Sequence, residues 1–184
     1  GLTGWLEKEW EKEKVIDGGM DQVAMAAKLG NKGLCNSRLA QGFDINRVVD
    51  QTCQSALGEA FWHNEIEFTR FLLQNGADPN RVMDDSSLLC LAARGGVELV
   101  RVLLDHGANP NLSCHNRCQC EYPLSAAARF GNLDTVEALV RKEADINPVS
   151  LTDICGSPLA SAVCAQAFPV VRLLLKYGAD VNAS

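Results

Sequence analysis

A phrase of five residues recurs five times along the chain at nearly constant spacing. It begins with Gly or Glu, has an acidic or amide residue at its third position, and closes on Asn. The closing residues are Asn46, Asn80, Asn111, Asn147 and Asn182, which lie 34, 31, 36 and 35 residues apart. A fixed period of about 20–50 residues is typical of solenoids, in which each unit buries its apolar face against the next. The period therefore predicts an array of five stacked units.

An apolar run such as Val102–Leu104 or Leu173–Leu175 comes just before each phrase except the first, which follows a polar stretch. We interpret the run as the inner face of a helix. The residue that opens the phrase is expected to cap this helix in the left-handed conformation, which Gly adopts without strain; such residues are Gly76, Gly107 and Gly178. The closing Asn is expected to hydrogen-bond backbone across its turn and so to fix the loop that follows.

The other half of each unit is a short Ala-rich stretch, at 55–61, 87–93, 122–128 and 157–163. Ser87 and Ser157 stand where a helix N-cap is needed, because a Ser hydroxyl accepts a hydrogen bond from the first free backbone N–H groups. Pro123 and Pro158 fall in the first turn, where proline is tolerated. Each unit is therefore predicted to be a pair of helices.

These residues resemble the ankyrin repeat, with its Ala-Ala pair and its Gly-Ala-Asp-Val-Asn close. The resemblance covers residues 17–184, and the first of about five repeats, with Asp21–Ala27 and Gly30-Asn31, is degenerate. It implies an all-α solenoid of helix-turn-helix units joined by extended finger loops. Residues 1–16 carry Leu2, Trp5, Leu6 and Trp10 at helical spacing, so we expect an amphipathic helix that caps the array there.

The C-terminal end differs from this, because residues 170–175 are as apolar as those of any internal repeat. We expect either that the array continues in a longer protein or that this apolar face contacts another molecule. The chain is otherwise expected to be a monomer.

Charge and hydropathy exclude several classes of partner. The formal net charge is −6, and no cluster of basic residues exists, so no nucleic-acid partner is expected. No apolar stretch approaches the roughly 18–20 residues that span a bilayer, so no membrane partner is expected either. Without an export signal, the eight cysteines are predicted to be reduced thiols in a cytoplasmic or nuclear protein.

Signatures of catalysis are missing from the sequence. It has no Gly-rich phosphate loop, no Gly-x-Ser-x-Gly elbow and no His-Glu-x-x-His motif, so we expect no enzyme, no catalytic residue and no cofactor. The segment Cys114–Cys120 holds three cysteines and His115, but its spacing does not match paired zinc clamps. No metal site is therefore expected. Cys53, Cys120 and Cys155 occupy the same position on three of the fingers. Successive fingers are expected to lie about 10 Å apart, which is too far for a disulfide, so we expect thiols at these positions.

The resemblance implies that a partner protein or peptide binds to the concave groove and the finger loops. Arg and Trp dominate interface energetics, and both types fall at groove positions of this chain. The expected contacts are Lys28, Trp62, His63, Met83, Asp84, Arg94, Gln119, Glu121, Arg129, Phe130, Asp153 and Ile154. A basic and aromatic floor suits a peptide with a carboxylate or phosphate near its middle and a basic end. The alternative is a small-molecule or enzymatic site in the same groove.

Overall fold

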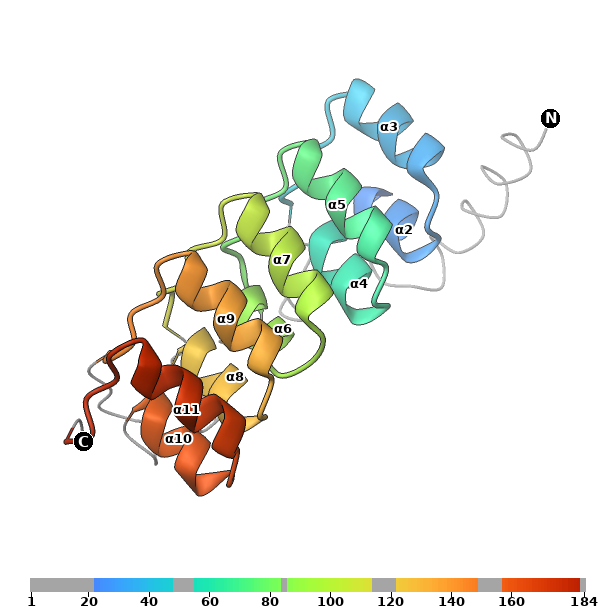
Figure 1. Cartoon of the computed structure of the whole chain (residues 1–184). Coiled ribbons are helices and arrows are strands. Elements are labelled where there is room, and N and C mark those ends of the chain that lie inside the picture. Colours follow the sequence, from blue (N-terminus) through green and yellow to red (C-terminus); the bar gives the residue numbers. More distant parts are fainter. Residues whose placement is uncertain (1–21, 48–54, 84–85, 114–121, 149–156, 183–184) are drawn as a thin grey trace. The chain divides into compact units, whose positions relative to one another are not determined.

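The computed structural model describes residues 22–47, 55–83, 86–113, 122–148 and 157–182. These ranges contain ten helices and two strands of two residues each, which confirms the predicted all-α repeat fold (Figure 1). The chain divides into two compact units, Gly1–Ala77 and Asp78–Ser184. The first unit holds helices α2–α5, and the second holds both strands and helices α6–α11. The capping helix expected over residues 1–16 lies outside the described residues.

The first unit consists of two helix pairs. α2 (Gln22–Lys28) contacts both α3 (Lys32–Ala40) and α4 (Ala56–Trp62), and α4 contacts α5 (Ile66–Gln74). Ser55 begins α4, since its Oγ accepts a hydrogen bond from the Gly58 N–H at 3.1 Å. The interior of this unit is apolar and includes Ala60 and Leu72, both fully buried. The two short helices therefore lie side by side, each backed by its longer partner.

The second unit stacks three helix pairs. Its short helices are α6 (Leu88–Ala93), α8 (Pro123–Arg129) and α10 (Pro158–Cys164). Its long helices are α7 (Val97–Asp105), α9 (Leu133–Arg141) and α11 (Phe168–Lys176). Each row is continuous, because α8 contacts α6 and α10, and α9 contacts α7 and α11. Figure 1 shows the two rows as separate layers of this unit.

Local sequence signals explain where these helices begin and end. The hydroxyl of Ser87 accepts from the Cys90 N–H, and that of Ser157 accepts from the Ala160 N–H, as the sequence predicts for N-caps. Gly107 and Gly178 end the long helices with φ near +90°, at +88° and +90°. Glu143 adopts φ +63° at the same position, although a side chain disfavours this conformation.

The core of the second unit lies between its two rows. The long helices contribute Leu103, Leu139 and Leu174, and the side chains of all three are fully buried. The short helices contribute mostly alanines, whose small side chains allow neighbouring helices to approach closely; Ala93, Ala127, Ala128 and Ala162 are all fully buried. Large buried side chains thus come from the long helices and small ones from the short helices, so that neighbouring short helices can pack closely.

Asparagine side chains link successive repeats within the second unit. In each link the Asn side-chain amide donates to the backbone carbonyl of the residue that follows the C-cap of the next long helix. The Asn side-chain oxygen accepts from the backbone N–H of the residue two positions after that one. The bonds measure 2.6–3.3 Å and join Asn80 to Gly107 and Asn109, Asn111 to Glu143 and Asp145, and Asn147 to Gly178 and Asp180. The prediction that each Asn bridges its own turn is thus corrected. The preceding Asp or Asn side chain makes that local bond, as Asp78 does to the Asn80 N–H.

One finger of the second unit is a short hairpin, and it corrects the prediction for Met83. Strand β1 (Val82–Met83) pairs with β2 (Ser86–Ser87) in antiparallel register. Successive side chains of a strand point to opposite sides. Val82 accordingly faces outward with 46% exposure, whereas Met83 is only 1% exposed. Met83 is therefore a core residue and offers no surface to a partner.

Cysteine chemistry also departs from the prediction. Cys90 is disulfide-bonded, so the expectation that all thiols are reduced is wrong at this position. Among the other described cysteines, Cys35 and Cys164 are free. Cys53, Cys114, Cys118, Cys120 and Cys155 lie outside the described residues. The prediction was wrong here because it rested on the compartment inferred from the sequence, and because the spacing argument covered only the finger cysteines and left out Cys90, which lies on a short helix.

Candidate functional site

Arg94 and Phe130 form the most developed surface feature of the second unit. Arg94 caps the C-terminus of α6, and Phe130 occupies the same place on the adjacent α8. The Arg94 guanidinium carbon lies 5.2 Å from the centroid of the Phe130 ring. This is a cation–π contact, which contributes about 0.5–1 kcal/mol at an exposed site. Phe130 nonetheless keeps 48% of its surface exposed, so one side of the ring is open to a partner.

Stacking leaves the polar edge of Arg94 free. Among the described residues, the guanidinium has neither a hydrogen-bond nor an ion-pair partner. A guanidinium donates in its own plane and stacks through its faces, so one group can do both at once. Arg94 can therefore stay on the ring while it binds a carboxylate or a phosphate with two parallel hydrogen bonds.

Asn132 fixes the backbone on both sides of Arg94. It is the N-cap residue of α9, and its side-chain amide donates to the Ala93 carbonyl at 2.9 Å and to the Gly95 carbonyl at 3.0 Å. These two carbonyls flank Arg94 in the chain. Asn132 was not among the residues predicted from the sequence, although a signal was present: an amide residue follows Gly131 at the turn between the two helices, as Asn31 follows Gly30.

Arg129 lies next to Phe130 at the end of α8 and is partly buried. It is one of the residues expected to contact a partner. Cys164 and Ala165 occupy the corresponding end of α10, and both are exposed. The ends of the three short helices therefore form a row, in which the cationic and aromatic side chains come from α6 and α8.

The first unit presents a second group of expected contacts, on α2 and α4. Lys28 is the last residue of α2 and is exposed, and Trp62 is the last residue of α4 with 58% exposure. The Trp62 ring meets the Phe61 ring edge to face, at a centroid distance of 5.8 Å. His63 caps α4, and its Nε2 lies 3.7 Å from Oε2 of the buried Glu59. His63 thus contacts a side chain of its own helix, whereas the Trp62 side chain is mostly exposed to solvent.

The remaining expected contacts lie outside the described residues. They all belong to fingers: Asp84, Gln119, Glu121, Asp153 and Ile154. The cysteine-rich segment with Cys114, His115, Cys118 and Cys120 is also outside. In the part of the chain that the structure describes, no group of three His, Cys, Asp or Glu side chains is placed to hold a metal ion.

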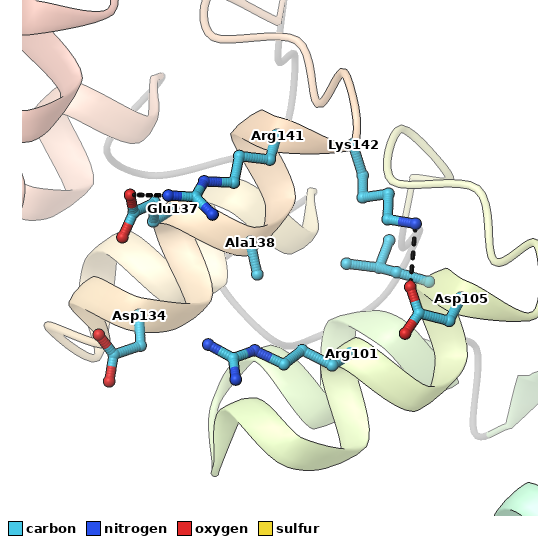
Figure 2. Close-up of a pocket in the computed structure, with 8 residues that line it drawn as sticks. Arg101, Asp105, Asp134, Glu137, Ala138, Arg141 and Lys142 are labelled. Atoms are coloured by element: carbon cyan, nitrogen blue, oxygen red, sulfur yellow. Dashed lines mark hydrogen bonds and ion pairs between the residues drawn. The ribbon is translucent and has the colours of Figure 1, made fainter.

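A hollow of about 360 Å³ lies between two long helices, on the other row of the second unit. Figure 2 shows its lining from α7 and α9. Two ion pairs lie among its lining residues: Lys142 Nζ lies 2.9 Å from Asp105 Oδ1 at the end of α7, and Arg141 Nη2 lies 2.7 Å from Glu137 Oε1 within α9. Arg101 and Asp134 also line it and have no ion pair among the described residues. No residue pattern in the sequence indicated this hollow, because its charged residues have the pattern of solvated helix faces.

Stacked helix pairs with a row of cationic and aromatic side chains at their short-helix ends define a helical repeat scaffold. The family model described as "Ankyrin repeats (3 copies)" matches residues 23–114 and 88–184. The chain belongs to the ankyrin-repeat family. Members of this family are generally protein–protein interaction modules, and the fold is typically a scaffold without catalytic activity.

Two curated relatives come from the spider Latrodectus tredecimguttatus. The chain is 32% identical to alpha-latrocrustotoxin-Lt1a over 104 residues and 34% identical to alpha-latroinsectotoxin-Lt1a over 111 residues. These segments make up 56% and 60% of the chain, but only 7% and 8% of the toxins. Among solved structures, the human ASB11 ankyrin repeat domain matches with a TM-score of 0.70 and 28% identity, over 89% of this chain and 72% of that one. None of the helices in the described ranges is long and apolar enough to cross a bilayer.

Proposed function

We propose that this chain binds a partner protein through the ends of its short helices, and that it acts by recognition and not by catalysis. The observation that carries the proposal is the Arg94–Phe130 pair, a stacked guanidinium whose donor edge is unoccupied by any described residue, beside an open aromatic face. Planar side chains of this kind contribute large contact areas at low entropic cost and dominate interface energetics.

The partner segment proposed for this surface is a peptide that carries a carboxylate or a phosphate near its middle. Arg94 would hold the anion, and Phe130 would cover an apolar side chain next to it. In the first unit, Lys28, Trp62 and His63 are proposed as partner contacts. In the second unit, Arg129 and the finger residues Asp84, Gln119, Glu121, Asp153 and Ile154 are proposed as further contacts. The acidic members of the fingers favour a peptide with a basic end.

A peptide library tests the proposal without any assumption about the partner's sequence. Random peptides displayed on phage are selected on the intact chain, and the enriched peptides are synthesised. We expect them to share an acidic residue and to lose about 2 kcal/mol or more of binding on Arg94→Ala, the usual scale of a hot spot. Trp62→Ala tests the first unit in the same way.

Arg172→Ala is the matched control for Arg94→Ala. Arg172 is an exposed arginine on the long helix α11, and it has no bonded partner among the described residues. Its loss is expected to change affinity by less than about 0.5 kcal/mol, as exposed substitutions usually do. Glu137, a natural choice from sequence alone, is unsuitable because it lines the hollow between α7 and α9. Peptides that bind equally well to the Arg94 and Arg172 variants would contradict the proposal.

A cytoplasmic or nuclear location is part of the proposal, as the sequence predicts. The disulfide at Cys90 is the one observation against it, since reducing compartments rarely preserve disulfides. Fluorescent tagging of the chain in its source cell tests the location directly, and the thiol count predicted below tests the disulfide separately.

A further inference from the structure

Glu59 is an acidic residue at a position where the other short helices are uncharged. Its counterparts in the other repeats are Met25, Leu91, Ala126 and Ser161. Glu59 is only 6% exposed, so its carboxylate has lost most of its contact with water. Burial of a charged group is unfavourable unless hydrogen bonds or an opposite charge replace that water. The chain thus keeps a destabilising group at a position that a neutral side chain fills elsewhere in the array.

Within the described part of the chain, the protein itself does not satisfy the Glu59 carboxylate. Neither oxygen accepts a hydrogen bond, and the one ion pair is to His63, whose Nε2 lies 3.7 Å from Oε2. That distance is longer than a hydrogen bond. The Glu59 oxygens are also not among the polar atoms that are sealed from solvent without a hydrogen bond, which in the described ranges are the hydroxyls of Thr69, Ser125 and Ser161. A polar group can therefore reach this carboxylate from outside.

Trp62 lies next to Glu59 on the same helix. It follows Glu59 by three residues in α4, and residues three or four apart share one helix face. The Trp62 side chain is 58% exposed, and no cation of the described residues lies over its ring. An open aromatic ring attracts cations through its quadrupole, and the neighbouring carboxylate attracts them through its charge. The two side chains together favour a cationic ligand.

We propose that Glu59 and Trp62 form a binding site for the guanidinium group of an arginine in the partner protein. A guanidinium stacks through its flat face and donates from its edge, so it can lie on the Trp62 ring while it pairs with Glu59. The protein contains the same kind of stacking at the end of α6, where the Arg94 guanidinium carbon lies 5.2 Å from the centroid of the Phe130 ring. A lysine ammonium is a compact, strongly hydrated charge and has no flat face to stack.

This inference deepens the function proposed above, because it rests on Trp62 as a partner contact and names the group that Trp62 recognises. It also gives a reason for the buried charge, since residues that serve binding are often retained at the expense of stability. The site belongs to the first unit alone. It therefore makes no use of Arg94 or Phe130, and the two proposals can fail separately.

Small capped amino acids test the site without the partner. N-acetyl-arginine amide, N-acetyl-lysine amide and the uncharged N-acetyl-citrulline amide are titrated into the intact chain at constant ionic strength. The indole N–H signal of Trp62, assigned with Trp62→Phe, reports binding by NMR. We expect the arginine probe to bind most tightly and the citrulline probe to leave the signal unchanged.

Glu59→Gln is expected to weaken binding of the arginine probe by about tenfold, the scale of one hydrogen bond to a charged group. Glu67→Gln is the matched control, because it removes the same charge from an exposed position on α5 of the same unit. It should leave the affinity unchanged. Equal weakening by the two variants would overturn the proposal, since the net negative charge of the chain would then be what attracts the probe. Tighter binding of the lysine probe, or no binding of the arginine probe, would also overturn it.

Glu59→Met separates a binding role from a structural one, because it introduces the side chain that the first repeat has at this position in Met25. We expect this variant to lose the arginine probe and to unfold at a higher temperature, since it removes a buried charge that has no hydrogen bond. A lower unfolding temperature would show that the carboxylate stabilises the fold, and would overturn the proposal. Failure of the proposed function is a different result: the selected peptides would then bind equally well to Arg94→Ala, whatever the arginine probe does.

Discussion

Asn132 of one repeat brackets Arg94 of the preceding repeat, because its side-chain amide donates to the carbonyls of Ala93 and Gly95 on either side of that residue. Two bonds from one amide restrict the backbone from which Arg94 extends. The neighbouring Phe130 ring restricts the side chain itself. Arg94 is thus held in place before any partner arrives, and preorganisation of this kind lowers the entropic cost of binding.

The first prediction follows from this bracket. Asn132→Ala is expected to weaken binding of Arg94-dependent peptides, although Asn132 itself need not touch them. Stability should fall by about 1 kcal/mol, the net contribution of a typical intramolecular hydrogen bond. Titration calorimetry and urea denaturation measure the two effects. Asn75→Ala is the control, because the Asn75 amide donates within its own helix, to the Phe71 carbonyl. If Asn132→Ala lowers stability but leaves affinity unchanged, its role is structural alone.

A second prediction concerns the asparagine links. Asn111→Ala removes a bond of 3.1 Å to the Glu143 carbonyl and one of 2.7 Å from the Asp145 N–H. Because Asn111 is exposed, water can replace part of what is lost, and we expect a cost of about 1–2 kcal/mol. Asn182→Ala should cost almost nothing, because the Asn182 side chain has no hydrogen-bond partner among the described residues. Equal unfolding midpoints for the two variants would refute a stabilising role for the links.

A third prediction concerns Ser125, whose hydroxyl is fully buried and has no hydrogen-bond partner within the described part of the chain. Burial of an unsatisfied hydroxyl is costly, so Ser125→Ala is expected to leave the protein equally stable or to stabilise it by up to about 1 kcal/mol. Ser157→Ala is the matched comparison: it removes the N-cap bond to the Ala160 N–H at 3.2 Å and should destabilise by about 1 kcal/mol. Loss of stability on Ser125→Ala would mean that the hydroxyl is bonded after all.

Local signals made most of the fold predictable. The N-caps Ser87 and Ser157, and the helix ends at Gly107 and Gly178, depend on a few adjacent residues, so the sequence specifies them directly. Period and spacing then fix the number of repeats. The resemblance to the ankyrin repeat predicted that Arg94 and Phe130 are exposed at the ends of their helices, and both are.

What the sequence did not reveal depends on residues far apart in the chain. Asn132 reaches back across 37 residues to the Gly95 carbonyl, and the asparagine links run to the next repeat instead of across their own turns. Met83 was placed on the surface because every finger residue was treated alike, whereas strand pairing turns alternate side chains inward. The hollow between α7 and α9 is lined by charged residues from both helices. The sequence of either helix alone does not indicate that these residues face one another.

A fourth prediction concerns Cys35 at alkaline pH. Burial raises the pKa of this thiol from 9.0 to about 11, because the buried site disfavours the thiolate. Between these values the unfolded chain loses the proton while the folded chain keeps it, so stability falls as pH rises across this window. Cys35→Ala should lose less stability than the natural chain between about pH 8 and about pH 10.5. Cys164→Ala, at an exposed free thiol, serves as the control. The same alkaline loss in all three proteins would contradict the prediction.

The last prediction concerns the disulfide at Cys90. The chain has eight cysteines, so a protein with every thiol reduced would give eight reactive groups after denaturation without reductant. Because Cys90 is disulfide-bonded, we expect at most six, and an intact mass lower than that of the reduced chain by at least two hydrogen atoms. Cys90 lies in the buried row of short helices that carries Arg94, so a covalent link there should stabilise that row. Reductant is therefore expected to lower the unfolding midpoint of the natural chain. Cys90→Ala should lower the midpoint measured without reductant, and adding reductant to this variant should lower its midpoint little further. Eight reactive thiols in the denatured, unreduced protein would show that Cys90 is free.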